Sequence, residues 1–529
     1  MSFADAAHPS KRASFSRKSR SLDLVRRLII SLWIALTPCP IFAENQPELS
    51  ASLDQSLNLI SSQRMLEDVQ TLSGPAFNGR QTGTLDDLAS AEFVRQRFVD
   101  LHTHRSSLPE PHTESANADE QIHLQSTPFR ATILGEHALL RVASTPDSPP
   151  DRIGPDYLPI LDSPSADVHA PVVFVGYGIS DPDGGFDEYA GLDVRGKVVL
   201  FLRGKPERYS KQVSHADKAH AAHAHGALGY LTATGPILNA YEARRGVTGR
   251  PGAFYGLTDP RRTIPGAWIS TDRARDILRA NPSADENQLR ALQQTLNEGH
   301  SPQSTVTDTV VTMRWHSAEH DGMLHNVVFT LPGNDAAKAE DAIVIGAHRD
   351  HFGKQGGLLF AGADDNASGT AVLLEVARVL HAMPVKPKRS IVLLSFSGEE
   401  QGLLGSRLYI SQPAVPLRST LAMINVDHAA VGNGRLTVGV TGMEQPAAQQ
   451  AGQAAGLADR LDVFGFFPGG DHVPFKEAGI PTVTVVSGGV HPHFHQPTDT
   501  ADTVNPDILA AAARYVLAAS RSARRRPVR

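Results

Sequence analysis

The sequence predicts an α/β protein with a mostly parallel or mixed sheet flanked by helices, and with a β-rich module inserted into the chain. From about residue 323, apolar runs rich in β-branched residues alternate with helical periodicity, as expected for a sheet covered on both faces. Between about 160 and 305, strands and glycine turns dominate instead. The 529 residues, 41% of them hydrophobic, are enough for roughly two or three domains.

The individual elements follow from periodicity and from turn residues. Residues 62–101 are predicted to be helical around a turn-rich loop at 79–84, then 102–121 form a surface loop and 124–142 form strands. In the inserted module the predicted strands are 171–178, 196–204, 227–232 and 264–270, with a helix at 218–226. In the last third the predicted strands are 326–331, 342–347, 390–396, 422–426 and 481–486, and the predicted helices are 368–383, 403–412, 447–454 and 508–520.

These elements define the expected organisation of the chain. A signal peptide occupies 1–43, the first part of the main domain 44–155 and the inserted module 156–310. The main domain continues over 311–520 and ends in a basic tail at 521–529.

The N-terminus has the order of segments typical of a secretory signal. Seven basic residues precede the apolar run 28–36, and small residues lead to Ala43. The run is too short to span a bilayer comfortably, so we expect export to the periplasm or extracellular space and no stable membrane span after cleavage. The alternatives are an uncleaved anchor, a twin-arginine signal, or a lipoprotein box at Cys39, which Pro38 disfavours.

Composition excludes some functions. Cys39 is the only cysteine and would leave with the signal, so the mature protein has no disulfide and no thiol chemistry. The formal net charge of −6 gives no electrostatic footprint for nucleic acid.

Candidate metal ligands follow the predicted strands of the main domain. In open α/β sheets, ligands bind beyond the carboxyl ends of the strands, so these side chains should meet at one edge. Histidine and carboxylate without thiolate suit zinc. The candidates exceed what one tetrahedral ion with an open position needs, and they suit two ions that share a bridging carboxylate. They are His348, Asp350, Glu399, Glu400, Asp427 and His495, together with one aspartate of the loop 362–366, either Asp364 or Asp365.

The residue types also indicate the chemistry. The small loop 362–366 would let a carboxylate approach two ions, whereas one of its aspartates also suits an N-cap for helix 368–383. Of two adjacent glutamates, one can bind metal while the other acts as general base. The expected reaction is attack of a metal-bound hydroxide on an amide.

At these residues the chain resembles metallopeptidase family 28, the di-zinc aminopeptidases and carboxypeptidases, in the subgroup with an inserted protease-associated domain. The motifs cover 346–504, and a looser framework covers roughly 60–520. The resemblance implies two zinc ions, a peptide substrate, and a protease-associated domain without catalytic residues at 156–310.

The resemblance also implies a role for each candidate. His348 would bind one zinc ion with Glu400. Asp427 and His495 would bind the other ion, and Asp365 would bridge the two. Glu399 would be the general base, and Asp350 would orient a metal ligand.

The chain departs from the family pattern at several positions. Arg349 stands where an aromatic residue or leucine is frequent. Phe494 replaces a tyrosine whose hydroxyl could stabilise an oxyanion. His428 replaces a methionine, and the nearby His351, His491 and His493 make an exchanged ligand conceivable.

The leading interpretation is a secreted or periplasmic di-zinc aminopeptidase. The alternatives are a carboxypeptidase or dipeptidase of the same family, a glutaminyl cyclase-like enzyme, and a non-catalytic binding protein. Arg349 could serve a carboxypeptidase as the cation for a terminal carboxylate. The oligomeric state stays open.

Overall fold

The computed structural model describes residues 46–103, 121–143, 150–239, 242–243, 246–259, 261, 263–278, 287–299 and 305–522. The predicted signal peptide, almost all of the predicted loop 102–121 and most of the basic tail therefore lie outside the described residues. Residues 50–529 cluster as one compact unit.

In the described chain, the main domain is built on one mixed sheet of eight strands. Its four central strands run parallel, whereas β1, β11 and β17 join antiparallel to their inner neighbours. Every residue of β12, β15 and β19 is buried, which explains why these segments are continuous apolar runs. In order across the sheet the strands are β1 (Ile122–Leu134), β11 (Ser317–Leu331), β15 (Ser390–Phe396), β12 (Ala342–His348), β16 (Thr420–Val426), β19 (Thr482–Ser487), β17 (Leu436–Thr441) and β18 (Leu461–Phe464).

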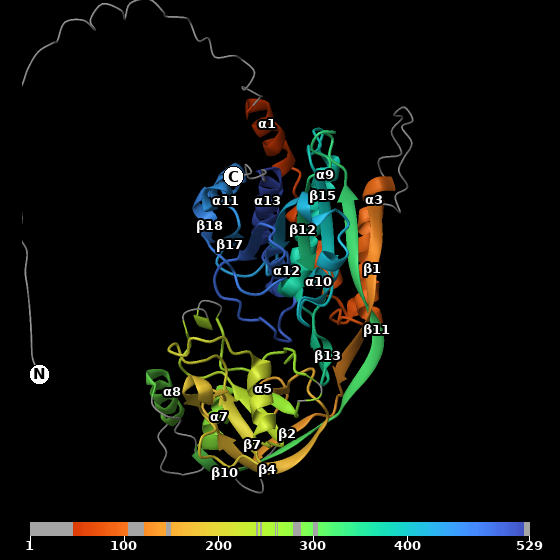
Figure 1. Cartoon of the computed structure of the whole chain (residues 1–529). Coiled ribbons are helices and arrows are strands. Elements are labelled where there is room, and N and C mark those ends of the chain that lie inside the picture. Colours follow the sequence, from red (N-terminus) through yellow and green to blue (C-terminus); the bar gives the residue numbers. More distant parts are fainter. Residues whose placement is uncertain are drawn as a thin grey trace, which may run out of the picture. The chain divides into compact units, whose positions relative to one another are not determined.

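Helices cover both faces of this sheet (Figure 1). On one face Val69, Phe98 and Leu517 pack with Ile345 in the main core, and on the other Tyr409 and Phe475 form a second core. The first face carries α2 (Ser62–Leu72), α3 (Leu85–Thr103), α9 (Gly369–Ala382), α11 (Gln445–Ala454) and α13 (Pro506–Ser522). The second carries α10 (Leu404–Ser411) and α12 (His472–Glu477), and α1 (Gln46–Leu57) precedes them all in the chain. The predicted α/β fold is therefore confirmed.

A second sheet of seven described strands forms the inserted module. In order it contains β2 (Leu139–Ala143), β10 (Thr305–Trp315), β4 (Ala166–Phe174), β7 (Val198–Leu202), β8 (Gly229–Ala233), β9 (Gly266–Ile269) and β3 (Tyr157–Pro159). Its helices are α5 (His215–Ala224), α7 (Thr271–Leu278) and α8 (Gln288–Glu298). Two small hairpins complete the fold, β5 (Ser180–Asp181) with β6 (Phe186–Asp187) and β13 (Gly353–Gln355) with β14 (Leu358–Phe360).

The strands of the second sheet extend beyond the expected limits of the module at 156 and 310. β2 lies before residue 156, and β10 continues to Trp315. These two strands pair with each other, with Leu139 opposite Arg314. Along the chain, β2 comes directly after β1 of the main sheet, and β10 comes directly before β11 of the main sheet. The chain therefore enters and leaves the module through adjacent strands.

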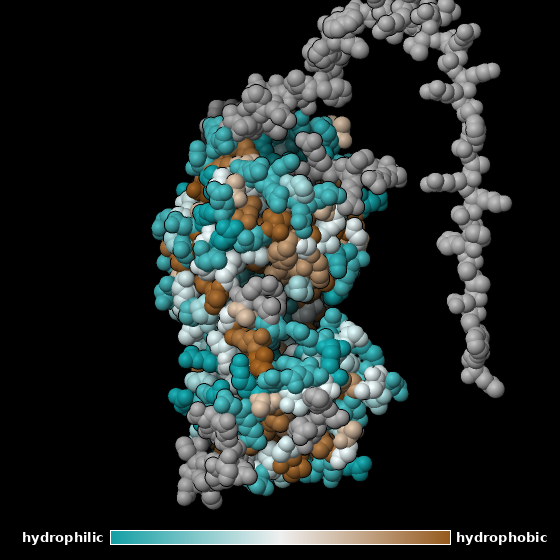
Figure 2. Space-filling model, turned by 90° about the vertical axis from the view of Figure 1, so that its left-hand side faces the viewer, coloured by the Kyte–Doolittle hydropathy of each residue, from teal (hydrophilic) through white to brown (hydrophobic). Residues whose placement is uncertain are grey.

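The surface has a mixed character. Figure 2 shows a face on which hydrophilic residues predominate and hydrophobic residues occur in separate groups. Large exposed apolar side chains such as Leu85, Val306 and Val490 belong to different parts of the chain. Within the described residues, no helix combines the length and apolar character needed to cross a bilayer.

Candidate metal centre

The predicted ligands converge at one edge of the main sheet. His348 is the last residue of β12, and Asp427 directly follows β16. Glu399 and Glu400 come soon after β15, and His495 lies in the loop that follows β19. Asp365 lies in the helical turn η4 (Ala363–Ser368), which leads into α9. The carboxyl ends of the parallel strands thus place the candidates as the sequence predicts.

The first donor group consists of His348, Asp427 and Asp365. His348 Nε2 lies 3.3 Å from Asp427 Oδ1 and 3.4 Å from Asp365 Oδ1. Its other ring nitrogen, Nδ1, lies 3.2 Å from the carbonyl oxygen of Asp350 and must donate there, which leaves the lone pair on Nε2. Two donors on one tetrahedral zinc ion, with bonds of about 2.0–2.1 Å, are roughly 3.3 Å apart. The first group has this spacing.

The second donor group consists of His495, Glu400 and the other oxygen of Asp365. His495 Nε2 lies 3.2 Å from Asp365 Oδ2 and 3.6 Å from Glu400 Oε2. Asp365 Oδ2 is buried and makes no hydrogen bond. A buried carboxylate oxygen without a hydrogen bond requires another partner, and a cation fits. The two oxygens of Asp365 therefore face two different donor groups, as a bridging carboxylate must.

The pairing of ligands implied by the resemblance is wrong. It placed His348 with Glu400 and Asp427 with His495, whereas the structure groups His348 with Asp427 and Glu400 with His495. β12 pairs with both β15 and β16, and Asp427 directly follows β16, so its carboxylate reaches His348. Glu400 lies four residues beyond the end of β15 and reaches the loop of His495 instead.

His351 supports the second group. Its Nδ1 lies 2.9 Å from Glu400 Oε1, and because a carboxylate only accepts, the imidazole donates. This bond turns the other oxygen of Glu400 toward His495. The proximity of His351 noted in the sequence thus has a structural meaning, an orienting contact to a ligand.

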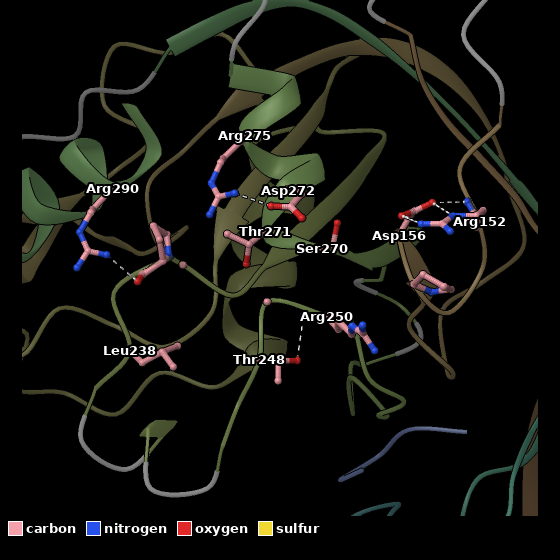
Figure 3. Close-up of a pocket in the computed structure, with 14 residues that line it drawn as sticks. Arg152, Asp156, Leu238, Thr248, Arg250, Ser270, Thr271, Asp272, Arg275 and Arg290 are labelled. Carbon is pink, nitrogen blue, oxygen red and sulfur yellow. Dashed lines mark hydrogen bonds and ion pairs between the residues drawn. The ribbon is translucent and has the colours of Figure 1, made fainter. Parts of the chain in front are cut away.

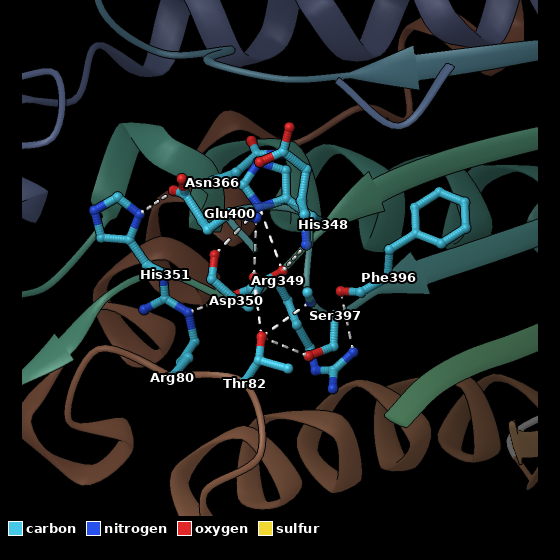
Figure 4. A network of polar contacts seen from close by, with 12 residues as sticks. Arg80, Thr82, His348, Arg349, Asp350, His351, Asn366, Phe396, Ser397 and Glu400 are labelled. Carbon is cyan, nitrogen blue, oxygen red and sulfur yellow. Dashed lines mark hydrogen bonds and ion pairs between the residues drawn. The ribbon is translucent and has the colours of Figure 1, made fainter. Parts of the chain in front are cut away.

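Asp350 holds the surroundings of the first group (Figure 4). Its buried carboxylate accepts hydrogen bonds from Thr82 Oγ1 at 3.0 Å and from the backbone N–H groups of Glu399 at 3.3 Å and Glu400 at 3.4 Å. It also lies 3.6 Å from His348 Nδ1. Asp350 therefore fixes both the ligand ring and the turn that carries the two glutamates.

Glu399 stands beside the donor groups without belonging to either. Burial raises the pKa of Glu399 well above its usual value, His348 opposes this shift, and the negative charge of Asp427 adds to it. A carboxyl group that holds a proton more readily than usual suits proton transfer near neutral pH.

Arg349 points away from the donor groups into the core. Its guanidinium is fully buried and donates to Asp87 Oδ1 and to the carbonyl oxygen of His325, both at 2.6 Å, and to Ser90 Oγ at 3.1 Å. All its donors face protein groups, so Arg349 does not serve as a cation for a substrate carboxylate.

Arg80 is a second buried arginine, which the sequence analysis missed (Figure 4). It donates to the carbonyl oxygens of Arg349, Ala361, Gly362 and Leu72. It thereby ties the His348 loop to the turn that carries the bridging aspartate. Its loop, 79–84, shows only turn residues in the sequence, and nothing local signals these long-range contacts.

The inserted module contacts the loop of His495. The backbone N–H of Ala253 donates to the carbonyl oxygen of His495 at 3.0 Å, and Gln496 Nε2 donates to the carbonyl oxygen of Pro251 at 2.9 Å. On the other side of this ligand, the ring of Phe494 stacks at 3.7 Å. Phe494 therefore fixes the imidazole by packing.

A large cavity lies elsewhere, in the inserted module (Figure 3). It measures about 600 Å³, and its lining includes Arg152, Arg250, Arg275 and Arg290. Two of these arginines are already paired, Arg152 with Asp156 and Arg275 with Asp272. None of the predicted ligands lines it, so cavity size does not locate the chemistry in this molecule.

The match to a known protein family lies within the main domain. Residues 326–520 match peptidase family M28. Over these residues the chain is similar to that family. The family predicted from the sequence is confirmed, whereas the protease-associated nature of the module stays a prediction.

Individual relatives are named as peptidases too. Aminopeptidase YwaD of Bacillus subtilis is 31% identical over 193 residues, which are 34% of this chain and 41% of that protein. Probable glutamate carboxypeptidase AMP1 of Arabidopsis thaliana is 30% identical over 299 residues, 51% of this chain and 39% of that protein. The chain thus spans about two fifths of each. The solved structure of BSAP, a zinc aminopeptidase from Bacillus subtilis, superposes with a TM-score of 0.56 at 21% identity, covering 87% of this chain and 94% of that one, which shows a shared fold.

Proposed function

We propose that this chain is a two-zinc exopeptidase that removes N-terminal residues from peptides. The observation that carries the proposal is the position of Asp365, whose two oxygens face two separate histidine–carboxylate groups. The histidine and carboxylate donors suit zinc. When bound, two such ions polarise a substrate carbonyl and lower the pKa of an attacking water.

The residues of the site have different roles in this proposal. His348 and Asp427 hold one ion, Glu400 and His495 hold the other, and Asp365 joins the two groups. Glu399 takes the proton from the attacking water and delivers it to the leaving amine. Asp350 keeps the backbone of Glu399 in place, because it accepts the N–H of that residue.

An aminopeptidase is favoured over a carboxypeptidase. A carboxypeptidase needs a cation for the terminal carboxylate of its substrate. Arg349, the candidate for this task in the sequence, is buried and bonded to Asp87. Relatives with both names occur, the aminopeptidase YwaD and the probable glutamate carboxypeptidase AMP1, so substrates decide between the two activities.

The decisive experiment measures metal and substrate together. Purified protein should contain at least about two zinc ions per chain. It should hydrolyse aminoacyl-nitroanilides, and leave their N-acetylated forms intact, because the free amine is required. A chelator should abolish release and zinc should restore it. Cleavage only at the C-terminus of test peptides would favour a carboxypeptidase, cyclisation of N-terminal glutamine a cyclase, and metal binding without turnover a binding protein.

Replacing Asp350 with asparagine should weaken zinc binding about 10- to 100-fold, because outer partners of metal-bound histidines tune affinity to this extent. The amide would keep one acceptor oxygen and replace the other with an NH2 group, so only one of the N–H groups of Glu399 and Glu400 would keep its acceptor. Competition with a zinc-binding dye measures the affinity. Asp321→Asn, at a solvent-exposed aspartate, is the control, and equal affinities in both variants would contradict the role of Asp350.

We also propose that the protein is exported. The basic, apolar and small-residue segments of 1–43 support this. N-terminal sequencing of the protein from the periplasm or medium should begin after Ala43. A full-length protein retained in membranes would instead indicate an uncleaved anchor.

A further inference from the structure

Three further side chains meet next to the proposed two-zinc centre. Asp364 Oδ2 lies 2.7 Å from His491 Nδ1 and 3.8 Å from His428 Nδ1. One donor atom from each of the three residues lies within 4.8 Å of the others, and all three residues are less than a tenth exposed. They line one small pocket together with Phe494. None of them is a ligand of the two proposed zinc ions.

Asp364 and His491 are joined by a short contact between Asp364 Oδ2 and His491 Nδ1. Asp364 Oδ1 accepts the N–H groups of Ala430 at 2.8 Å and Val431 at 3.1 Å, which leaves Oδ2. His491 Nε2 lies 3.1 Å from the carbonyl oxygen of Ser487 and must donate there. In a neutral imidazole the lone pair is then on Nδ1, opposite an oxygen that can only accept. The contact is satisfied either by a second proton on His491 or by a cation that both atoms bind.

His428 brings a third donor to this contact. Its Nδ1 lies 3.8 Å from Asp364 Oδ2, while its Nε2 lies 3.6 Å from Asp427 Oδ1 and 3.8 Å from Asp365 Oδ2. A proton on His491 would join only two of the three residues. A divalent ion can bind one atom of each residue at once, because the three atoms lie within 4.8 Å of one another.

We propose that Asp364 Oδ2, His428 Nδ1 and His491 Nδ1 form a third divalent-cation site of the zinc class. Two imidazoles and one carboxylate are a typical zinc donor set, and all three residues line the same small pocket. Each donor residue has its other polar atom directed at a second partner, the usual arrangement around bound zinc.

The third site is coupled to the two-zinc centre through one imidazole. With Nδ1 on the third ion, His428 presents Nε2–H to the carboxylates of Asp365 and Asp427. The ring of Phe494 lies 5.0 Å from His428 and 3.7 Å from His495, so it packs against a ligand of each site. The third ion would therefore fix the ring that neighbours the bridging carboxylate.

The first test counts zinc in the metal-free full-length protein during titration. The wild type should take up about three equivalents, and His491→Gln and His428→Met about two each, because each variant removes one donor of the third site. His493→Gln is the matched control, since His493 lines the same pocket but bonds Thr498, and it should keep about three. Equal stoichiometry in all four proteins would overturn the proposal.

Anomalous diffraction at the zinc edge on wild-type crystals removes any dependence on the variants. A peak about 2.0–2.1 Å from Asp364 Oδ2, His428 Nδ1 and His491 Nδ1 is expected. A direct hydrogen bond between His491 and Asp364 with no peak would overturn the third site. A peak there without peaks at Asp365 would support the third site and contradict the proposed two-zinc function, so the two failures are distinguishable.

Discussion

Replacing Glu399 with glutamine should lower kcat by roughly 10²- to 10⁴-fold while the zinc content stays unchanged. Glutamine has nearly the same shape but cannot take a proton from the attacking water. Glu399 lies in neither donor group, and its backbone N–H bond to Asp350 does not depend on the side chain. Initial rates on aminoacyl-nitroanilides and zinc analysis of the same sample measure both quantities.

The control for this variant is Glu477→Gln, at an exposed glutamate paired with Arg407. It should keep both turnover and metal. Near-normal turnover in Glu399→Gln would contradict the assignment of the base. Loss of one zinc ion would instead make Glu399 a ligand, and would require a different pairing of the donors around Glu400.

The sequence predicts the central strands well because burial determines their composition. β12, β15 and β19 are buried along their whole length, so each appears as an uninterrupted apolar run with bounds within one residue of the prediction. β17 and β18 were not predicted. β18 has only four residues and no buried one, so its sequence has no clear hydrophobic pattern. An edge strand such as β18 forms because the neighbouring strand offers it backbone hydrogen bonds. Its own sequence does not show which segment that neighbour will be.

The limits of the inserted module show the same effect. β2 and β10 pair although more than 160 residues separate them in the chain. No change in composition marks these strands, because β2 follows β1 and β10 leads into β11. A boundary drawn from local character therefore falls inside the second sheet.

The sequence predicts that the candidate residues converge at one edge of the sheet, but it does not predict which of them face each other. The rule that ligands gather at the carboxyl ends of parallel strands brings six of the seven candidates together, and Asp365 joins them from the turn η4. Which ligand faces which depends on strand order and on side-chain direction. Asp364 illustrates the second limit. The sequence suggested a helix cap for one aspartate of its loop, whereas the carboxylate of Asp364 accepts the distant N–H groups of Ala430 and Val431.

Replacing Arg349 with methionine should lower the free energy of unfolding by about 3–5 kcal/mol, because it leaves the carboxylate of Asp87 buried without its cation. The side chains of both residues are completely buried, and Arg349 also donates to the carbonyl oxygens of Ser395 and Phe396. Urea unfolding measures the loss. Arg130→Met, the same substitution in an exposed ion pair with Asp321, should change stability by less than about 1 kcal/mol.

The loss in Arg349→Met should also depend on pH. Burial raises the pKa of Asp87 to about 6 even though Arg349 opposes the shift, so removing Arg349 raises this pKa further. At pH values between the pKa of Asp87 in the unfolded chain and its pKa in the folded variant, the folded variant binds more protons at Asp87 than the unfolded chain does. The free energy of unfolding of the variant therefore falls as pH rises. The difference from wild type should therefore be larger at about pH 8 than at about pH 5.5, where Asp87 is largely protonated in the folded variant. Comparing the two proteins at each pH cancels the titration of the metal ligands they share. A difference independent of pH would mean that lost packing and lost hydrogen bonds to carbonyls, and not the unpaired charge of Asp87, account for the effect.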